Sequence, residues 1–401
     1  MTGHSQYTDG ARGSAGEVFR AFLKLGLTSF GGPVAHLSYF RNEFVVRRKW
    51  LGESEYADVV ALCQFLPGPA SSQVGMTLGI ARAGLLGAFA AWCGFTLPSA
   101  AAMILFAYGV ALMRDAAHAP WLHGLNIVAV AVVAQAVWAM ARALCPDALR
   151  ATIAVAAALF ILAVPLPLAQ IAVIAGGGAV GWLLLRRLEI PKPGHLRFAV
   201  PRGAAIASLL LFFALLTGLP FLAQDHALAL FASFYRSGAL VFGGGHVVLP
   251  LLQQAVVPQG WISNGAFLAG YGAAQAVPGP LFTFAAYLGA AMRDAPNGWI
   301  GGALCLVAIF LPSFLLLVGV LPFWDRLRAI APVRRAMAGV NAAVVGLLLA
   351  ALYTPVWTSA ILSPLDFALA LAAFLLLAVW KLPPWIVVLF GAVGASALSL
   401  I

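Results

Sequence analysis

Charged residues are scarce in this sequence. Its 401 residues include 23 Lys or Arg and 13 Asp or Glu, which is 9% of the chain, while 63% are hydrophobic. Soluble domains average about 25% charged residues, and so few charges do not cover a water-exposed surface. Apolar runs of bilayer-spanning length recur from about residue 84 onward and lack the alternation of membrane β-strands. The composition therefore excludes a soluble protein and predicts an all-α polytopic membrane protein.

Several chemical motifs are also missing. There are four cysteines and no Cys-x-x-Cys pair, so we expect no disulfide framework, no metal site and no cofactor. No GxxxxGK[ST] loop is present, which excludes an ATP-driven pump. Without an HExxH motif and with its carboxylates dispersed, the chain is not expected to be an enzyme. Residues 1–16 are small and polar without an apolar core, so no cleavable signal peptide is expected.

The cations that give the net charge of +10 form short clusters between apolar runs, at 47–49, 186–202 and 326–335. This distribution is typical of cytoplasmic loops under the positive-inside rule and not of a nucleic-acid-binding domain. The lipid bilayer, and not a nucleic acid, is the expected environment.

An internal repeat is the most informative feature of the sequence. Residues 24–69 match residues 236–280 with a gap of one residue. The matched anchors are Lys24 with Arg236, Phe30-Gly31-Gly32 with Phe242-Gly243-Gly244, Trp50 with Trp261, Gln64 with Gln275, and Pro67-Gly68-Pro69 with Pro278-Gly279-Pro280. Further on, Leu97-Pro98-Ser99 matches Leu311-Pro312-Ser313, and Gly124-Leu125-Asn126 matches Gly339-Val340-Asn341.

The charges of the loops predict that the two repeats are inverted in the membrane. The loop at 47–49 is Arg-Arg-Lys while its counterpart at 258–260 is uncharged, and the basic stretch 326–335 corresponds to a stretch with one arginine at 114–123. The apolar runs predict about nine full spans, with a cytoplasmic N-terminus and a periplasmic C-terminus. The expected parts are an N-terminal tail (1–16), transmembrane repeat 1 (17–143), linking transmembrane helices (144–226), inverted repeat 2 (227–354) and C-terminal transmembrane helices (355–401).

Four further segments, 18–46, 53–82, 229–256 and 265–292, are each interrupted near the middle by FGG or PGP. Each half is roughly 12–14 residues, or about 20 Å of helix, which reaches the midplane of a bilayer without crossing it. Proline on both sides of glycine removes two amide donors and disfavours helix. These segments are interpreted as four broken hairpins, either re-entrant or formed from kinked full spans.

The doubled FGGP/FGGG and PGP pattern, with a tryptophan between and a Gly-x-Asn helix later, resembles the chromate ion transporter (CHR) family in its long, two-repeat form. The resemblance covers roughly residues 18–354. It implies a secondary active transporter in the bacterial inner membrane that exports chromate, a tetrahedral oxyanion, and uses the proton-motive force. The residues alone indicate only a carrier with inverted repeats.

The PGP motifs have the chemistry of an anion site. A proline at the first helical position leaves the next amides unpaired, and these donors lie at the positive end of the helix dipole. Hydroxyls in the first turns either add donors or cap their own helices, and the glycines of FGG either form an amide nest or allow close packing. The candidate binding residues are Lys24, Gly31, Gly32, Pro67, Gly68, Pro69, Ser71, Ser72, Arg236, Gly243, Gly244, Pro278, Gly279, Pro280 and Thr283.

Lys24 and Arg236 each stand six residues before FGG, partway into a half-helix. A cation at bilayer depth usually marks an ion path, although the alternative is that the side chain snorkels to the surface. A buried carboxylate or histidine can carry a coupling proton, and the alternative for a carboxylate here is an ion pair with Arg47 or Arg48. The candidates for coupling or gating are Asp58, His36, His246, Gln64, Gln275, Asn126 and Asn341.

The sequence leaves several alternatives open. The same helix ends also suit a sulfate carrier, since chromate and sulfate are similar tetrahedral dianions, or a passive anion channel. The expected partners are chromate, with sulfate as an alternative substrate, and protons as coupling ions. The sequence is also compatible with a homodimer.

Overall fold

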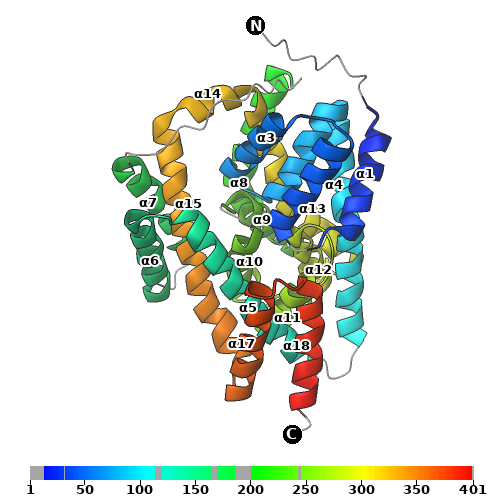
Figure 1. The fold of residues 1–401 in the computed structure, drawn as a ribbon, viewed down its shortest axis with the longest axis vertical. Helices are drawn as coiled ribbons and strands as arrows, with labels where there is room; N and C mark the ends of the chain where they lie inside the picture. The colour runs from blue at the N-terminus through cyan, green and yellow to red at the C-terminus, as the bar shows by residue number, and fades with distance from the viewer. Residues whose placement is uncertain are drawn as a thin grey trace.

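The computed structural model describes residues 13–30, 32–112, 120–164, 169–185, 200–242 and 245–399. Every regular element in these ranges is a helix, which confirms the predicted all-α fold. Figure 1 shows an elongated bundle with α1 and α3 in its upper part and α17 and α18 in its lower part, where the chain ends.

The helices of the first half of the chain are α1 (Ala15–Thr28), α2 (Gly32–Phe40), the π-helix η1 (Arg41–Arg47), α3 (Glu53–Phe65), α4 (Ala70–Leu112), α5 (Pro120–Leu144), α6 (Ala148–Ala163) and α7 (Ala169–Leu184). A connecting helix follows, α8 (Arg202–Leu222).

The helices of the second half are α9 (His226–Ala239), η3 (Gly245–Val247), α10 (Val248–Val256), α11 (Asn264–Ala274), η4 (Leu281–Thr283), α12 (Phe284–Ala290), α13 (Gly298–Val320), η5 (Leu321–Phe323), α14 (Trp324–Ala329), α15 (Ala331–Ala351), η6 (Leu352–Trp357), α16 (Thr358–Ala360), α17 (Pro364–Ala378) and α18 (Pro384–Leu398).

The helices break where the FGG and PGP motifs stand, as the sequence predicts. α1 and α9 each have 14 residues and end just before FGG, while α3 and α11 end just before PGP. The long element α4 is itself two helices, because Ala83 and Gly84 have non-helical backbone angles and Gly84 has a φ of +65°. Its second part begins where the sequence predicts the first full span.

Within the described residues, five helices are long and apolar enough to cross a bilayer: Ala70–Leu112, Pro120–Leu144, Arg202–Leu222, Gly298–Phe323 and Ala331–Ala360. The other four spans that the sequence predicts correspond to α6, α7, α17 and α18, which have 15 or 16 residues. At 1.5 Å per residue each is about 23 Å long, which is shorter than a hydrocarbon core of about 30 Å.

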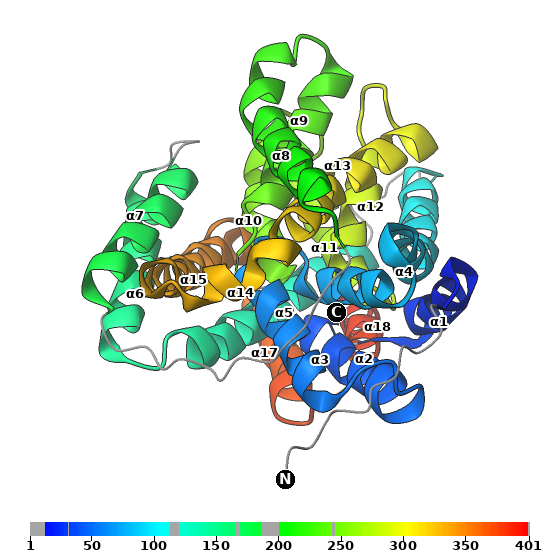
Figure 2. The ribbon, with the colours of Figure 1, turned by 90° about the horizontal axis from the view of Figure 1, so that it is seen from above.

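The two halves of the chain exchange their packing partners. α5 packs against α17 and α18 of the second half, whereas α15 packs against α6 and α7 of the first half. Figure 2 shows α6 and α7 beside α15 at one edge of the bundle. Close contacts between glycines make both interfaces tight, with Gly124 against Gly391 and Gly339 against Gly177. Such reciprocal packing is what a twofold relation between two repeats produces.

Large apolar side chains cover much of the outside. Leu159 of α6, Leu183 of α7, Leu210 and Phe213 of α8 and Leu371 of α17 are each more than half exposed. Because apolar side chains gather on the outward faces of several helices, the natural surroundings of these faces are lipid chains.

Candidate functional site

The two PGP turns are bound to each other's repeat by reciprocal hydrogen bonds. The amide of Gly68 donates to the carbonyl of Val241 at 2.6 Å, and the amide of Gly279 donates to the carbonyl of Ser29 at 3.0 Å. Ser29 and Val241 are the residues that precede the two matched Phe-Gly-Gly motifs. Each PGP turn therefore lies against the FGG break of the other repeat.

Both central glycines need a left-handed backbone. The φ of Gly68 is +122° and that of Gly279 is +109°, a region that side chains with a Cβ rarely adopt. The space beside them is also filled by equivalent residues: Ser313 contacts Gly68, and Ser99 contacts Gly279. The prolines that flank Gly68 have separate roles, since the carbonyl of Pro67 accepts from Gln73 Nε2 at 2.7 Å and Pro69 precedes α4.

Buried hydroxyls and amides surround the two turns. Ser71, Ser72 and Gln73 lie in the first turn of α4 and are at most 3% exposed. Several of the buried side-chain atoms here have no hydrogen-bond partner among the described residues: Ser29 Oγ, Ser72 Oγ, Gln73 Oε1, Thr96 Oγ1, Gln275 Nε2 and Ser313 Oγ. Buried polar groups normally have partners, so this set is suited to a polar ligand or to water.

The other predicted hydroxyls are used within the protein. Thr283 Oγ1 donates to the carbonyl of Pro280 at 2.9 Å, so this hydroxyl caps its own turn. Ser71 Oγ lies 3.4 Å from Nδ1 of His36, whose Nε2 lies 3.2 Å from the carbonyl of Ser29. Pro278 precedes Gly279 in the second turn, and Pro280 precedes η4.

Of the FGG glycines, Gly32 begins α2 with a φ of +76°. Gly31, Gly243 and Gly244 lie outside the described residues.

The two matched cations have different surroundings. Lys24 Nζ lies 3.5 Å from Glu43 Oε2, and its side chain is 53% exposed while that of Glu43 is 6% exposed. Glu43 also accepts from Arg47 at 2.8 Å and from Arg48 at 2.7 Å. Burial raises the pKa of Glu43, but the hydrogen bond from Arg48 and the charges of Lys24, Arg48 and Arg47 outweigh it and hold the pKa below its usual value.

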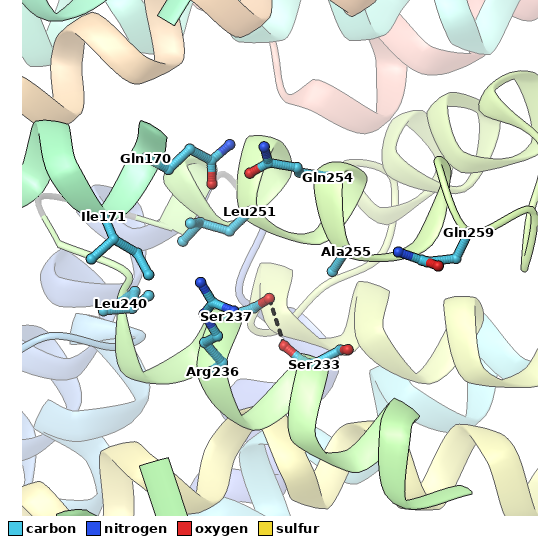
Figure 3. Close-up of a pocket in the computed structure, with 10 residues that line it drawn as sticks. All are labelled: Gln170, Ile171, Ser233, Arg236, Ser237, Leu240, Leu251, Gln254, Ala255 and Gln259. Atoms are coloured by element: carbon cyan, nitrogen blue, oxygen red, sulfur yellow. Dashed lines mark hydrogen bonds between the residues drawn. The ribbon is translucent and has the colours of Figure 1, made fainter. Parts of the chain in front are cut away.

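Arg236 instead lines a cavity of about 180 Å³. The walls come from α7, α9, α10 and the turn after α10 (Figure 3), and they consist of Gln170, Ile171, Ser233, Arg236, Ser237, Leu240, Leu251, Gln254, Ala255 and Gln259. No ion pair or hydrogen bond joins the Arg236 side chain to another described residue.

The predicted coupling and gating residues are spread through the structure. His246 Nδ1 lies 2.6 Å from the hydroxyl of Tyr271, and Gln64 is exposed. Asn126 of α5 and Asn341 of α15 each have a buried Oδ1 with no hydrogen-bond partner among the described residues. Asp58 lies within α3 and is half-buried.

One polar pair in the structure was not predicted from the sequence. Nε2 of His123 on α5 lies 3.0 Å from Oδ1 of Asp366 on α17, and it joins the two halves across 243 residues of sequence. The only local signal is that His123 directly precedes the Gly-x-Asn motif. The described residues contain no group of three His, Cys, Asp or Glu that can hold a metal ion.

The fold and the site define a polytopic α-helical membrane protein with two related repeats and paired broken helices. The chromate transporter family model matches residues 16–182 and 228–395. The chain therefore belongs to the chromate transporter family.

Curated relatives cover most of this chain. A chromate transport protein of Pseudomonas aeruginosa is 31% identical over 83% of this chain and 79% of the relative. A chromate transport protein of Cupriavidus metallidurans is 26% identical over 81% of this chain and 78% of the relative. An uncharacterised transporter of Methanocaldococcus jannaschii is 28% identical over 84% of this chain and 83% of the relative. No solved structure matches this chain.

Proposed function

We propose that this protein is a secondary carrier that exports chromate across the bacterial inner membrane and is driven by the proton-motive force. The observation that supports this most directly is the pair of PGP turns, each bound to the other repeat and surrounded by buried hydroxyls and amides without partners among the described residues. The relatives named as chromate transport proteins support chromate as the substrate.

The chemistry of the turns suits a tetrahedral dianion. The first amides of α4 follow Pro69 and lack acceptors within the helix, as at every helix start, and the dipole of the helix favours negative charge there. Ser72 Oγ adds a donor that no described residue uses. A carrier must release its substrate. Neutral donors bind an anion without the strong ion pair that would slow this release.

In this proposal Lys24 and Arg236 supply positive charge toward the two ends of the pathway. The candidates for the group that carries a coupling proton are His36, His246, Asp58 and the pair His123–Asp366. In the same proposal the N-terminus lies in the cytoplasm and the C-terminus in the periplasm.

The test is uptake of labelled chromate into everted membrane vesicles, where export from the cell appears as accumulation. We expect accumulation that stops when the proton gradient is collapsed, and sulfate in excess tests the alternative substrate. Flux that only follows the chromate gradient would indicate a channel, and accumulation of sulfate but not chromate would reassign the substrate.

Variants test the residues. Pro69→Ala and Pro280→Ala extend the helices across the breaks and should impair uptake while the protein still inserts. Lys24→Gln and Arg236→Gln should weaken uptake, and Arg236→Lys should be milder because the charge remains although the planar guanidinium is lost. If both neutral variants export chromate like the wild type, these cations lie outside the pathway.

A further inference from the structure

The second repeat lacks the carboxylate that forms ion pairs with the cations of the first. The amide of Trp50 donates to the carbonyl of Phe44, and that of the matched Trp261 donates to the carbonyl of Val256. This hydrogen bond makes Phe44 equivalent to Val256, and the preceding Glu43 is therefore equivalent to Ala255. The one-residue gap between the repeats then falls after Phe44, around the π-helical segment Arg41–Arg47.

In the first repeat the Glu43 carboxylate occupies the space between the cations. It lies within 3.5 Å of Lys24, Arg47 and Arg48, and its side chain is 6% exposed. Counted back from the matched tryptophans, the counterparts of Arg47 and Arg48 are Pro258 and Gln259. Both repeats thus have a cation at the position of Lys24, but only the first repeat has a carboxylate beside it.

In the second repeat the corresponding space is an open cavity. Ala255 lines it where a glutamate carboxylate would stand, and Arg236 lines the same cavity with no ion pair among the described residues. Figure 3 shows Arg236 projecting from α9 toward Leu251 of α10, with Gln170 and Gln254 beyond. The volume of about 180 Å³ exceeds by more than tenfold the roughly 10–15 Å³ that one water molecule needs.

We propose that this cavity is an oxyanion-binding subsite, in which a tetrahedral dianion takes the place that the Glu43 carboxylate has in the first repeat. Arg236 is its charged ligand, since a guanidinium forms paired hydrogen bonds to an oxyanion. Ser233, Gln170 and Gln259 supply neutral polar groups around it. The subsite rests on the proposed function, and it adds a second binding position, apart from the PGP turns, beside the turn at 258–260.

The position gives the subsite a role in release. The turn at 258–260 is predicted to be external, and the Lys24–Glu43 cluster is at the matched place on the other side of the membrane. An exported anion that leaves the PGP turns therefore meets, at the outer end, a cavity whose arginine has no ion pair among the described residues. At the inner end the Glu43 carboxylate already contacts Lys24, Arg47 and Arg48.

The decisive variant restores the missing carboxylate. Ala255→Glu places an anion where the substrate is proposed to bind, and Ala255→Gln adds nearly the same volume without charge. Binding of labelled chromate and of labelled sulfate is measured on the purified full-length protein. We expect Ala255→Glu and Arg236→Gln to weaken binding about tenfold or more, and Ala255→Gln and Arg236→Lys to weaken it clearly less.

A second measurement does not depend on transport. Ser233→Cys is introduced into a chain whose four native cysteines are replaced, and the reaction of the new thiol with an anionic methanethiosulfonate is timed. Sulfate is the protecting anion because chromate oxidises thiols. We expect sulfate to slow the reaction, and we expect this protection to be lost when Arg236→Gln is added.

The outcomes separate the two proposals. One outcome refutes the subsite: the wild type accumulates chromate, Ala255→Glu and Arg236→Gln bind it normally, and sulfate does not protect the thiol of the Ser233→Cys variant. In that case the Arg236 guanidinium only extends toward water. If the wild type does not transport chromate in vesicles but sulfate protects that thiol, the subsite stands and the proposed substrate is wrong.

Discussion

Replacing Gly68 by alanine is the sharpest structural test of the PGP turn. The φ of Gly68 is +122°, and a Cβ there would overlap Ser313 Oγ and lie 2.8 Å from Gln73 Nε2. The backbone strain of a non-glycine residue in such a conformation costs about 1–3 kcal/mol. Overpacking of a filled site costs about 1–3 kcal/mol more.

The sum, about 2–6 kcal/mol, is a large part of the free energy of unfolding of a typical protein. We expect Gly68→Ala to lower the apparent melting temperature of the purified protein on the order of 5 °C, and to reduce chromate uptake in the same preparation. Gly176→Ala is the matched control, because no heavy atom lies within 4 Å of a Cβ at that helical position.

A second substitution separates the two contributions. Ser313 Oγ has no hydrogen-bond partner among the described residues, so Ser313→Ala removes the overlap without breaking a bond. The double variant should recover the part of the loss that comes from Ser313 Oγ, and it should keep the backbone part and the close contact with Gln73 Nε2. If Gly68→Ala melts like Gly176→Ala, the turn tolerates a side chain and the reasoning about its geometry is wrong.

Three further predictions concern orientation, pH and coupling. Single cysteines that replace Lys49 and Gln259 should react with an impermeant reagent from opposite sides of the membrane, and reaction from one side would contradict the inverted topology. Because the pKa of Glu43 is lowered in the folded protein, its stabilisation is full above the usual value of 4.5 and is lost as the pH falls through the folded value. Glu43→Gln should therefore be less stable at pH 7 by about 1.5–3 kcal/mol, and the difference from the wild type should shrink on acidification; a difference that stays constant with pH would argue against these ion pairs. His123→Gln removes the titratable imidazole beside Asp366 and should reduce proton-driven uptake more than chromate binding, whereas equal losses in both would assign the pair to structure.

The breaks in the helices could be predicted from the sequence because their cause is local. Proline removes an amide donor and glycine permits positive φ at any position. PGP therefore interrupts a helix whatever other segments pack against it. The repeat was also visible, since the anchors from Lys24 to Asn126 recur in order. Beyond Asn341 no anchor was found, yet α17 and α18 pack on α5 as α6 and α7 pack on α15.

The partners across the repeats could not be predicted in the same way. That Gly68 binds Val241 and that Ser313 fills the space beside it depends on how two distant segments dock, and no spacing in the sequence encodes that contact. The same holds for His123 with Asp366. Matched residues also differ in their surroundings: Lys24 is paired and Arg236 faces a cavity, because a single difference, Glu43 against Ala255, decides whether a counter-ion is present.

The reciprocal hydrogen bonds also constrain how a transport cycle can proceed. Each PGP amide donates to the carbonyl before the FGG break of the other repeat, so a shift of the broken helices of one repeat alone would break both of these hydrogen bonds. Leaving a buried amide without its acceptor costs about 1–3 kcal/mol, and moving the two pairs separately incurs that cost at each step. A concerted movement keeps both bonds. The geometry of Gly68 and Gly279 therefore favours a cycle in which both turns change their exposure together.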